Sequence, residues 1–103
     1  MKCLLCNFIG EYHHVYTRKA SPELEHEEQN KISLCRYHHI MSHAMGTKYM
    51  ANKFSEIRKW LQENDWTLDP VTDKWENYEL REKQIWIRAG RLQQNKAGSS
   101  EDM

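Results

Sequence analysis

Apolar residues in the middle of the chain recur at the spacing of an α-helix. The residues with this spacing are Met50, Phe54, Ile57 and Leu61, with Trp60 beside them. Intervals of three and four residues place side chains on one face of a helix, so we predict a long helix over residues 37–64. Gly46 is a point where this helix can be interrupted, because glycine is a poor helix former.

The chain before this helix has the composition of short β-strands. Residues 8–17 are rich in aromatic and β-branched side chains and contain Gly10, a pattern typical of a strand or a bent hairpin arm. We predict a second short strand over residues 31–35. Residues 21–30 are acidic and contain a proline near their start, which favours a solvent-exposed loop with about one helical turn.

The C-terminal half is rich in tryptophan, and its secondary structure is harder to predict. Asp69 and Pro70 mark a turn, and residues 75–92 fit either a helix or a pair of strands. All four tryptophans lie between Trp60 and Trp86. Large aromatic side chains in a small domain are more often core residues than binding residues, so we expect them mainly to pack.

Composition narrows the class of protein. A chain of 103 residues that is 39% hydrophobic and 29% charged is one small domain. It has no apolar run of membrane-spanning length and no hydrophobic stretch after Met1 that resembles a secretory signal, so we expect a cytoplasmic protein. Fifteen basic residues balance fifteen acidic ones. The net charge therefore does not favour nucleic-acid binding.

Two pairs of residues have the spacing of a zinc knuckle. Cys3-x-x-Cys6 and Cys35-x-x-His38 each place two metal ligands in one tight turn, and together they complete a tetrahedron. This accounts for an odd number of cysteines in a reducing compartment. A structural Zn²⁺ would contribute on the order of 10 kcal/mol of folding free energy. The alternative is that the cysteines are ordinary buried thiols.

The remaining histidines suggest a second metal site with a base beside it. His39 and His43 are four residues apart, on one face of the predicted helix, and with His13 they form a candidate set of ligands for a divalent ion. His14 follows His13 in a strand, so its side chain points to the opposite face and is free to act as general base. The alternative is that these histidines are surface residues or structural hydrogen-bonding groups.

The pattern as a whole resembles the HNH endonuclease family. The resemblance covers about residues 3–43, and it rests on the following motifs: Cys3-x-x-Cys6, His13-His14, Asn30, Leu34-Cys35-x-x-His38-His39 and His43. It implies an α+β fold with a ββα-metal core, a structural zinc knuckle, a following long helix and a small C-terminal extension. It also implies a small phage-type protein that hydrolyses DNA phosphodiester bonds, acting in the cytoplasm of a bacterium or of a phage-infected host cell.

The resemblance assigns a role to each motif residue. It implies that His14 is the general base, that Asn30 orients the loop and the base, and that His13, His39 and His43 bind a catalytic Mg²⁺, Mn²⁺, Ni²⁺ or Zn²⁺. The expected domains are a nuclease core over residues 1–65, an extension over residues 66–96 that packs on the core or contacts DNA, and a disordered tail over residues 97–103.

The sequence departs from the family pattern at three places. His38 stands where many relatives have cysteine, a His-His pair replaces the usual Asp-His pair, and the loop before Asn30 is acidic. The adjacent His38 and His39 leave open which ring serves which metal. The acidic side chains of this loop would repel phosphates, so we expect them to point into solvent. These side chains are Glu23, Glu25, Glu27 and Glu28.

Two other functions compete with the endonuclease. A noncatalytic zinc-binding module that grips DNA or a protein partner requires only the four knuckle residues, and leaves the other histidines without a metal-binding role. A thiol enzyme built on Cys3-x-x-Cys6 is disfavoured because no strand precedes the motif. The expected partner is DNA, and we expect no membrane association. The amino-acid sequence leaves open which DNA sequence is preferred, whether one or both strands are cut, and whether the protein forms a homodimer.

Overall fold

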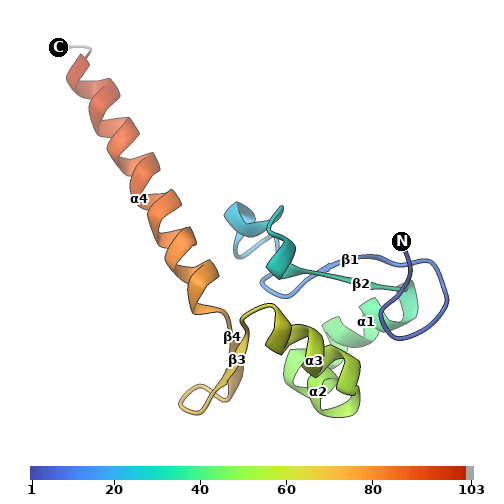
Figure 1. The fold of residues 1–103 in the computed structure, drawn as a ribbon. Helices are drawn as coiled ribbons and strands as arrows, with labels where there is room; N and C mark the ends of the chain where they lie inside the picture. Colours follow the sequence, from blue (N-terminus) through green and yellow to red (C-terminus); the bar gives the residue numbers. More distant parts are fainter. Residues whose placement is uncertain (102–103) are drawn as a thin grey trace.

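The computed structural model describes residues 1–101, with side chains as far as Arg91, and has an α+β fold (Figure 1). The described chain contains four α-helices and two small antiparallel sheets. The strands are β1 (Glu11–His14), β2 (Lys31–Leu34), β3 (Thr67–Asp69) and β4 (Lys74–Glu76). The α-helices are α1 (Arg36–Met45), α2 (Thr47–Lys53), α3 (Ser55–Glu63) and α4 (Tyr78–Glu101), and two 3-10 turns, η1 (Pro22–Leu24) and η2 (Glu28–Asn30), lie in the acidic loop.

The first sheet pairs β1 with β2, which lie within the two segments predicted as strands. The strands are antiparallel, with His13 opposite Ile32 and His14 opposite Lys31. Gly10 lets the chain pass close to β2 before β1 begins, since a Cβ atom built there would lie 2.1 Å from the Ser33 hydroxyl. The N-terminal segment is held against this sheet by a hydrogen bond of 2.8 Å from the backbone N–H of Leu4 to the carbonyl of Ser33.

The single long helix predicted over residues 37–64 is wrong, because the structure divides this segment into α1, α2 and α3. Gly46 separates the first two with φ of +87°, a conformation that favours glycine because it has no Cβ. Phe54 separates the second pair with extended backbone angles of −118° and 113°. The apolar spacing does select the buried face, since Met50, Ile57 and Leu61 are all core residues.

One hydrophobic core joins the first sheet to the helices and to the start of α4. Its buried residues are Cys3, Leu24, Ile32, Leu34, Cys35, Met50, Ala51, Ile57, Leu61, Trp66 and Leu80. Trp66 also donates a hydrogen bond of 2.7 Å to the carbonyl of Gln29, which ties the core to the acidic loop. Trp60 and Trp75 pack against the core, but Trp86 is 69% exposed on α4. Core packing is therefore confirmed for three of the four tryptophans.

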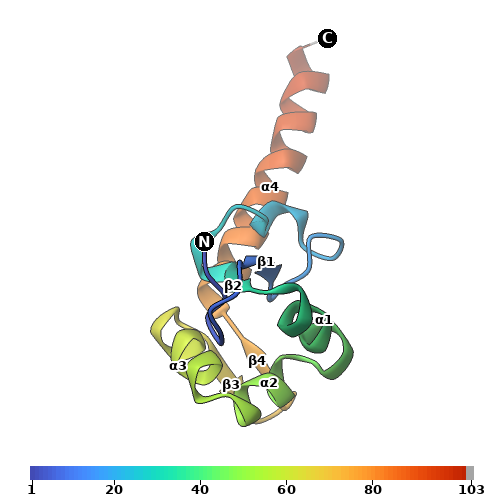
Figure 2. The same cartoon turned by 90° about the vertical axis from the view of Figure 1, so that its right-hand side faces the viewer.

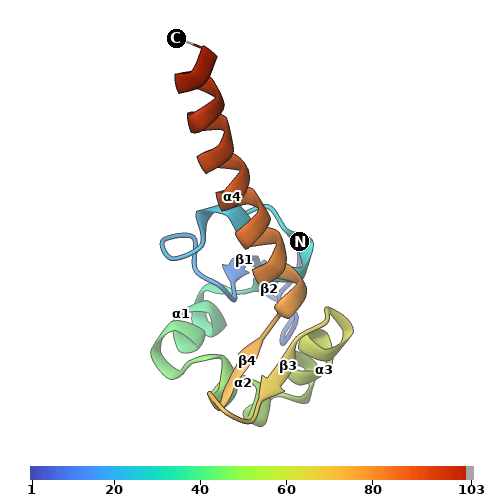
Figure 3. The same ribbon diagram turned by 90° about the vertical axis from the view of Figure 1, so that its left-hand side faces the viewer.

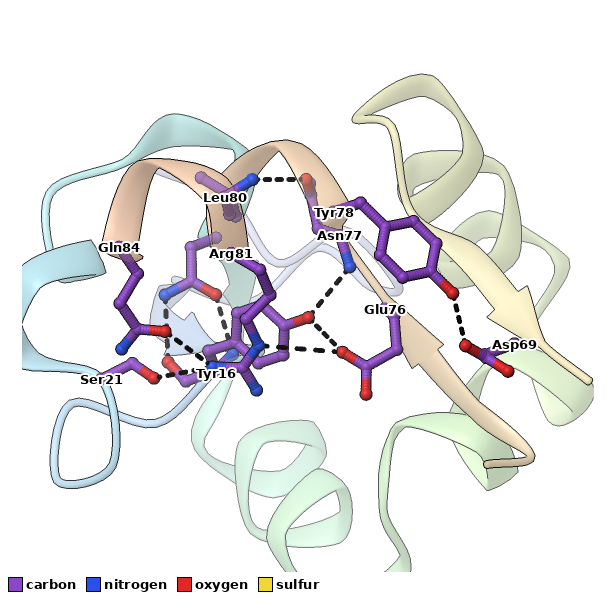
Figure 4. A network of polar contacts seen from close by, with 10 residues as sticks. Tyr16, Ser21, Asp69, Glu76, Asn77, Tyr78, Leu80, Arg81 and Gln84 are labelled. Atoms are coloured by element: carbon purple, nitrogen blue, oxygen red, sulfur yellow. Dashed lines mark hydrogen bonds and ion pairs between the residues drawn. The ribbon is translucent and has the colours of Figure 1, made fainter. Parts of the chain in front are cut away.

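The C-terminal extension consists of the β3–β4 hairpin followed by α4, the helix that rises out of the body in both side views (Figure 2, Figure 3). Its first turns lie beside the loop that contains η1. Polar contacts of Tyr16 join this extension to the end of β1 (Figure 4). The Tyr16 hydroxyl donates to the Glu76 carboxylate and accepts a hydrogen bond of 2.9 Å from the backbone N–H of Asn77. The Arg81 guanidinium lies 3.7 Å from the centre of the Tyr16 ring.

The expectation that the acidic loop points its side chains into solvent is wrong for Glu23. Its side chain is only 5% exposed and forms ion pairs of 2.6 Å with Arg88 and 3.0 Å with Arg91. Hydrogen bonding to Arg88 lowers the pKa of Glu23 to about 2. Glu27 similarly pairs with Lys83 at 2.5 Å. The loop thus turns two of its carboxylates, Glu23 and Glu27, toward basic residues of α4, because opposite charges attract in this partly buried contact.

The end of the chain bears on two further expectations. The backbone of α4 continues to Glu101 and so enters the expected tail, residues 97–103, whose last two residues lie outside the described part. No helix within residues 1–101 is both long enough and apolar enough to cross a membrane.

Candidate metal centres

The four knuckle residues meet at one point between the N-terminal turn and the start of α1. The atoms that could bind a metal, three Sγ and the Nδ1 of His38, all lie within 4.8 Å of one another. Cys6 Sγ lies 3.7 Å from Cys35 Sγ, and Cys35 Sγ lies 3.3 Å from His38 Nδ1. In a tetrahedral site with Zn–S bonds of about 2.3 Å, two sulfurs are about 3.8 Å apart. These residues could therefore hold a metal such as zinc.

The surroundings of Cys3 favour the thiolate that a metal requires. Burial opposes ionisation, but the backbone N–H groups of Cys35 and Leu5 and the His38 ring outweigh it and lower the pKa of Cys3 to about 6. The backbone N–H of Phe8 also favours the Cys6 thiolate, yet burial and the two neighbouring sulfurs raise the pKa of Cys6. Like charges at this separation repel, so several thiolates coexist only when a cation is shared among them.

The second cluster brings together the predicted ligands His13, His39 and His43. Their ring nitrogens offer three ligand atoms within 4.8 Å of one another. His39 and His43 stack with ring centres 4.8 Å apart, as expected for residues one helical turn apart on α1. His13 projects from β1 and meets both rings edge-on, at 5.0 Å and 5.1 Å. The structure thus places His38 with the cysteines and His39 with the histidines.

The environment of His13 suits a metal ligand. The residue is 7% exposed, and its Nδ1 is buried without a hydrogen-bond partner among the described residues. A buried polar atom without a partner costs free energy, which a bound ion or water molecule would recover. Burial, with smaller contributions from His39 and His43, lowers the pKa of His13 to about 3. The ring is neutral at physiological pH, the form that binds metals.

Glu11 belongs to this cluster and was missed by the sequence analysis. Its Oε1 accepts a hydrogen bond of 2.7 Å from His39 Nδ1, and its Oε2 lies 3.4 Å from the Arg36 guanidinium. A carboxylate that holds one ring nitrogen of a histidine leaves the other nitrogen turned toward a metal. The available signal was its position two residues before His13, which places both side chains on one face of β1.

His14 lies on the other face of β1, as predicted, and its ring orientation is determined by the acidic loop. Its Nε2 lies 2.9 Å from the carbonyl oxygen of Glu25. A carbonyl oxygen only accepts, so Nε2 carries the proton and Nδ1 carries the lone pair. Burial, with contributions from nearby Arg18 and Lys31, lowers the pKa of His14 below its ordinary value of 6.5, although Glu25 opposes this shift. His14 is thereby favoured as an unprotonated ring.

Asn30 lies at the base of the same loop and is fully buried. Its Oδ1 accepts a hydrogen bond of 2.7 Å from the backbone N–H of Tyr16, and its Nδ2 donates to the carbonyls of Tyr16 and Leu24 at 3.0 Å and 3.2 Å. Both ends of the loop are therefore tied to one side chain. Since the loop also supplies the carbonyl that orients His14, Asn30 lies where the sequence analysis expects an orienting residue.

A surface depression of about 240 Å³ brings the two histidine groups to a common space. It is lined by Tyr12, His14, Thr17, Arg18, Lys19, His39 and His43. Two of the three clustered histidines and the separate His14 therefore face one open cavity.

Comparison of the chain with models of protein families, with characterised proteins and with solved structures finds no match.

Proposed function

We propose that this protein is a metal-dependent DNA endonuclease of the HNH type, with a ββα-metal core that consists of β1, β2 and α1. The observation that carries the proposal is the shared cavity, in which His14 faces the same space as His39 and His43. If the three clustered histidines only packed against one another, nothing would require a fourth histidine on the opposite face of β1 with one nitrogen held by a hydrogen bond. A hydrolytic site requires both a metal-binding group and a base.

His14 performs the proton transfer in this mechanism. Its Nδ1 accepts a proton from a water molecule as the water oxygen attacks the phosphorus of a phosphodiester, while Nε2–H remains bonded to the Glu25 carbonyl. The new P–O bond forms as the bond from phosphorus to the 3′ oxygen breaks. The products are a 5′-phosphate and a 3′-hydroxyl, whose proton comes from solvent.

The remaining residues of the site bind and orient. His13, His39 and His43 would hold a divalent ion, which supplies positive charge to stabilise the phosphate and the departing oxygen. Glu11 fixes the ring of His39 by accepting its Nδ1–H. Asn30 keeps the loop closed so that the Glu25 carbonyl stays beside His14.

The proposal is tested by incubating supercoiled plasmid with zinc-loaded protein and added Mg²⁺, Mn²⁺ or Ni²⁺. We expect the wild type to nick or linearise the DNA, and His14→Ala to lose about 10²- to 10⁴-fold in rate, the usual contribution of a general base. The variant is purified in parallel, which also controls for contaminating nucleases. Equal zinc content and equal circular dichroism must accompany the loss. Absence of cleavage by the wild type with every metal rejects the endonuclease.

A second candidate is a noncatalytic zinc-binding module that docks on a protein, and one surface favours it. Phe8, Ile9 and Tyr37 are exposed beside the knuckle, at 74%, 84% and 68%, and line a shallow groove with Arg36. Exposed apolar patches commonly mark interaction sites. Retention of zinc and of the fold by a protein that cleaves no DNA would favour this candidate.

A further inference from the structure

The cavity at His14 is one half of a longer groove. A second depression of about 350 Å³ adjoins it and is lined by Tyr12, His14, Arg18, Glu25, His26 and Lys31. The two depressions share Tyr12, His14 and Arg18. The proposed base therefore lies between two binding spaces rather than at the end of one, which suits a chain that continues on both sides of the scissile bond.

Positive charge that is not neutralised by carboxylates is available in this groove. Three basic residues of α4, Lys83, Arg88 and Arg91, pair with Glu27 and Glu23 of the acidic loop. Arg36 is paired with Glu11. Lys19 has no ion pair within the described residues, and Arg18 has only a long contact of 3.7 Å to Glu25, with both side chains exposed. Exposed contacts of this kind are weak. Arg18 and Lys19 therefore keep charge for an anionic ligand, although the whole chain is neutral.

Tyr12 presents a half-exposed aromatic ring to the groove. The residue is 48% exposed, and the Lys31 ammonium lies 4.6 Å from the centre of its ring. Lys31 also lines the second depression, so its ammonium adds positive charge beside the exposed part of the ring. Aromatic faces beside a basic track stack on nucleobases, and only an unpaired base can turn its flat side onto such a ring. A base within an intact duplex is already covered by its neighbours.

From these observations we infer that the groove binds an unpaired polynucleotide strand, with one base stacked on Tyr12 and flanking phosphates held by Arg18 and Lys19. The inference deepens the proposed function and rests on it for the identity of the scissile bond. It assigns the substrate as single-stranded nucleic acid, or as duplex that is locally opened at the cleavage point. DNA and RNA share the chemistry that the groove recognises.

The experiment measures binding apart from cleavage. Zinc-loaded protein carrying His14→Ala is titrated into a labelled 15-nucleotide DNA strand, its RNA equivalent and the matching DNA duplex, and fluorescence anisotropy is recorded at several salt concentrations. We expect the single strands to bind at least about tenfold more tightly than the duplex. Adding Tyr12→Ala should weaken single-strand binding by roughly tenfold or more, whereas Tyr12→Phe should preserve it because the ring remains.

The roles of Arg18 and Lys19 are tested by the dependence of binding on salt concentration. Arg18→Ala and Lys19→Ala should each reduce the slope of log K against log salt by about 0.7, the value for one phosphate contact on a single strand. Lys59→Ala, an exposed lysine on α3, is the matched control and should leave the slope unchanged. Preferential binding of duplex, or equal binding of Tyr12→Ala and Tyr12→Phe, overturns the inference even if plasmid is cleaved. Strand binding as described, by a wild type that cleaves nothing, rejects only the endonuclease.

Discussion

The knuckle and the histidine cluster are two groups of potential metal ligands that both include residues of α1, yet they differ in closure. The knuckle has four potential ligands, two of them buried, and separations that suit a complete tetrahedron. The histidine cluster has three ligands graded from buried His13 to exposed His43, and it opens onto a cavity. Structural metal sites are closed and catalytic ones keep a position open.

The comparison shows how one helix can serve two purposes. His38 and His39 are neighbours in the sequence, but the rotation of about 100° per residue along α1 sends their rings to different clusters. The first turn of α1 is thereby anchored at the knuckle while its other face presents His39 and His43 to β1. We therefore expect damage to the knuckle to affect folding, and damage to the histidine cluster to affect metal binding alone.

The largest effect is expected at the knuckle. Cys35→Ser, or removal of zinc by a chelator, should unfold the N-terminal half, because the coupled metal contributes on the order of 10 kcal/mol and a small domain has less net stability than that. Zinc content and far-ultraviolet circular dichroism report the result, and zinc added back to the chelated wild type should restore the spectrum. A Cys35→Ser protein that remains folded with a full zinc content would show that this closed site is not structural.

The next effect separates the two clusters. His43→Ala should weaken binding of added Mn²⁺ or Co²⁺ by more than about 100-fold, because a ligand is lost. The melting temperature and the knuckle zinc should stay almost unchanged, since His43 is exposed and exposed substitutions usually change stability by less than about 0.5 kcal/mol. Calorimetric titration of the zinc-loaded protein measures the affinity. An unchanged affinity would exclude His43 as a ligand.

A smaller effect concerns the orientation of a ligand. Glu11→Ala should reduce metal affinity at the histidine cluster by about 10- to 100-fold, the usual cost of losing a partner that orients a ligand. Glu11→Gln should recover part of this loss, because its amide oxygen can still accept the hydrogen bond from His39 Nδ1. The same titration reports both variants. If the two variants bind metal equally well, Glu11 does not act through this hydrogen bond.

Much of the N-terminal half could be predicted from residue spacing. The strands at residues 11–14 and 31–34 and the grouping of Cys3, Cys6 and Cys35 follow from local patterns, because a metal site made of two tight turns depends on few degrees of freedom. The placement of His13 and His14 on opposite faces follows from the alternation of a strand. The assignment of a nuclease to this arrangement stays a prediction.

Other features could not be predicted, because they depend on contacts between distant segments. The break at Phe54 has no breaker residue, and packing of α2 and α3 against one core determines it rather than helix propensity. Glu23 looks like a solvated residue in an acidic run until α4 supplies Arg88 and Arg91 more than sixty residues later. Trp66 is the buried tryptophan among four similar candidates, and its ring centre lies 4.7 Å from that of Tyr16, a contact that spacing along the chain does not reveal.

The sequence by itself determined which residues can bind metal, the short strands that carry two of them, and the apolar stripe that becomes the core. These properties are local, since spacing along a strand or helix sets which face a side chain occupies. Only the tertiary structure decided that His38 and His39 join different clusters, that Glu11 accepts a hydrogen bond from His39, and that Glu23 and Glu27 face α4. These outcomes depend on pairs of groups brought together by folding, and no local pattern encodes the partner.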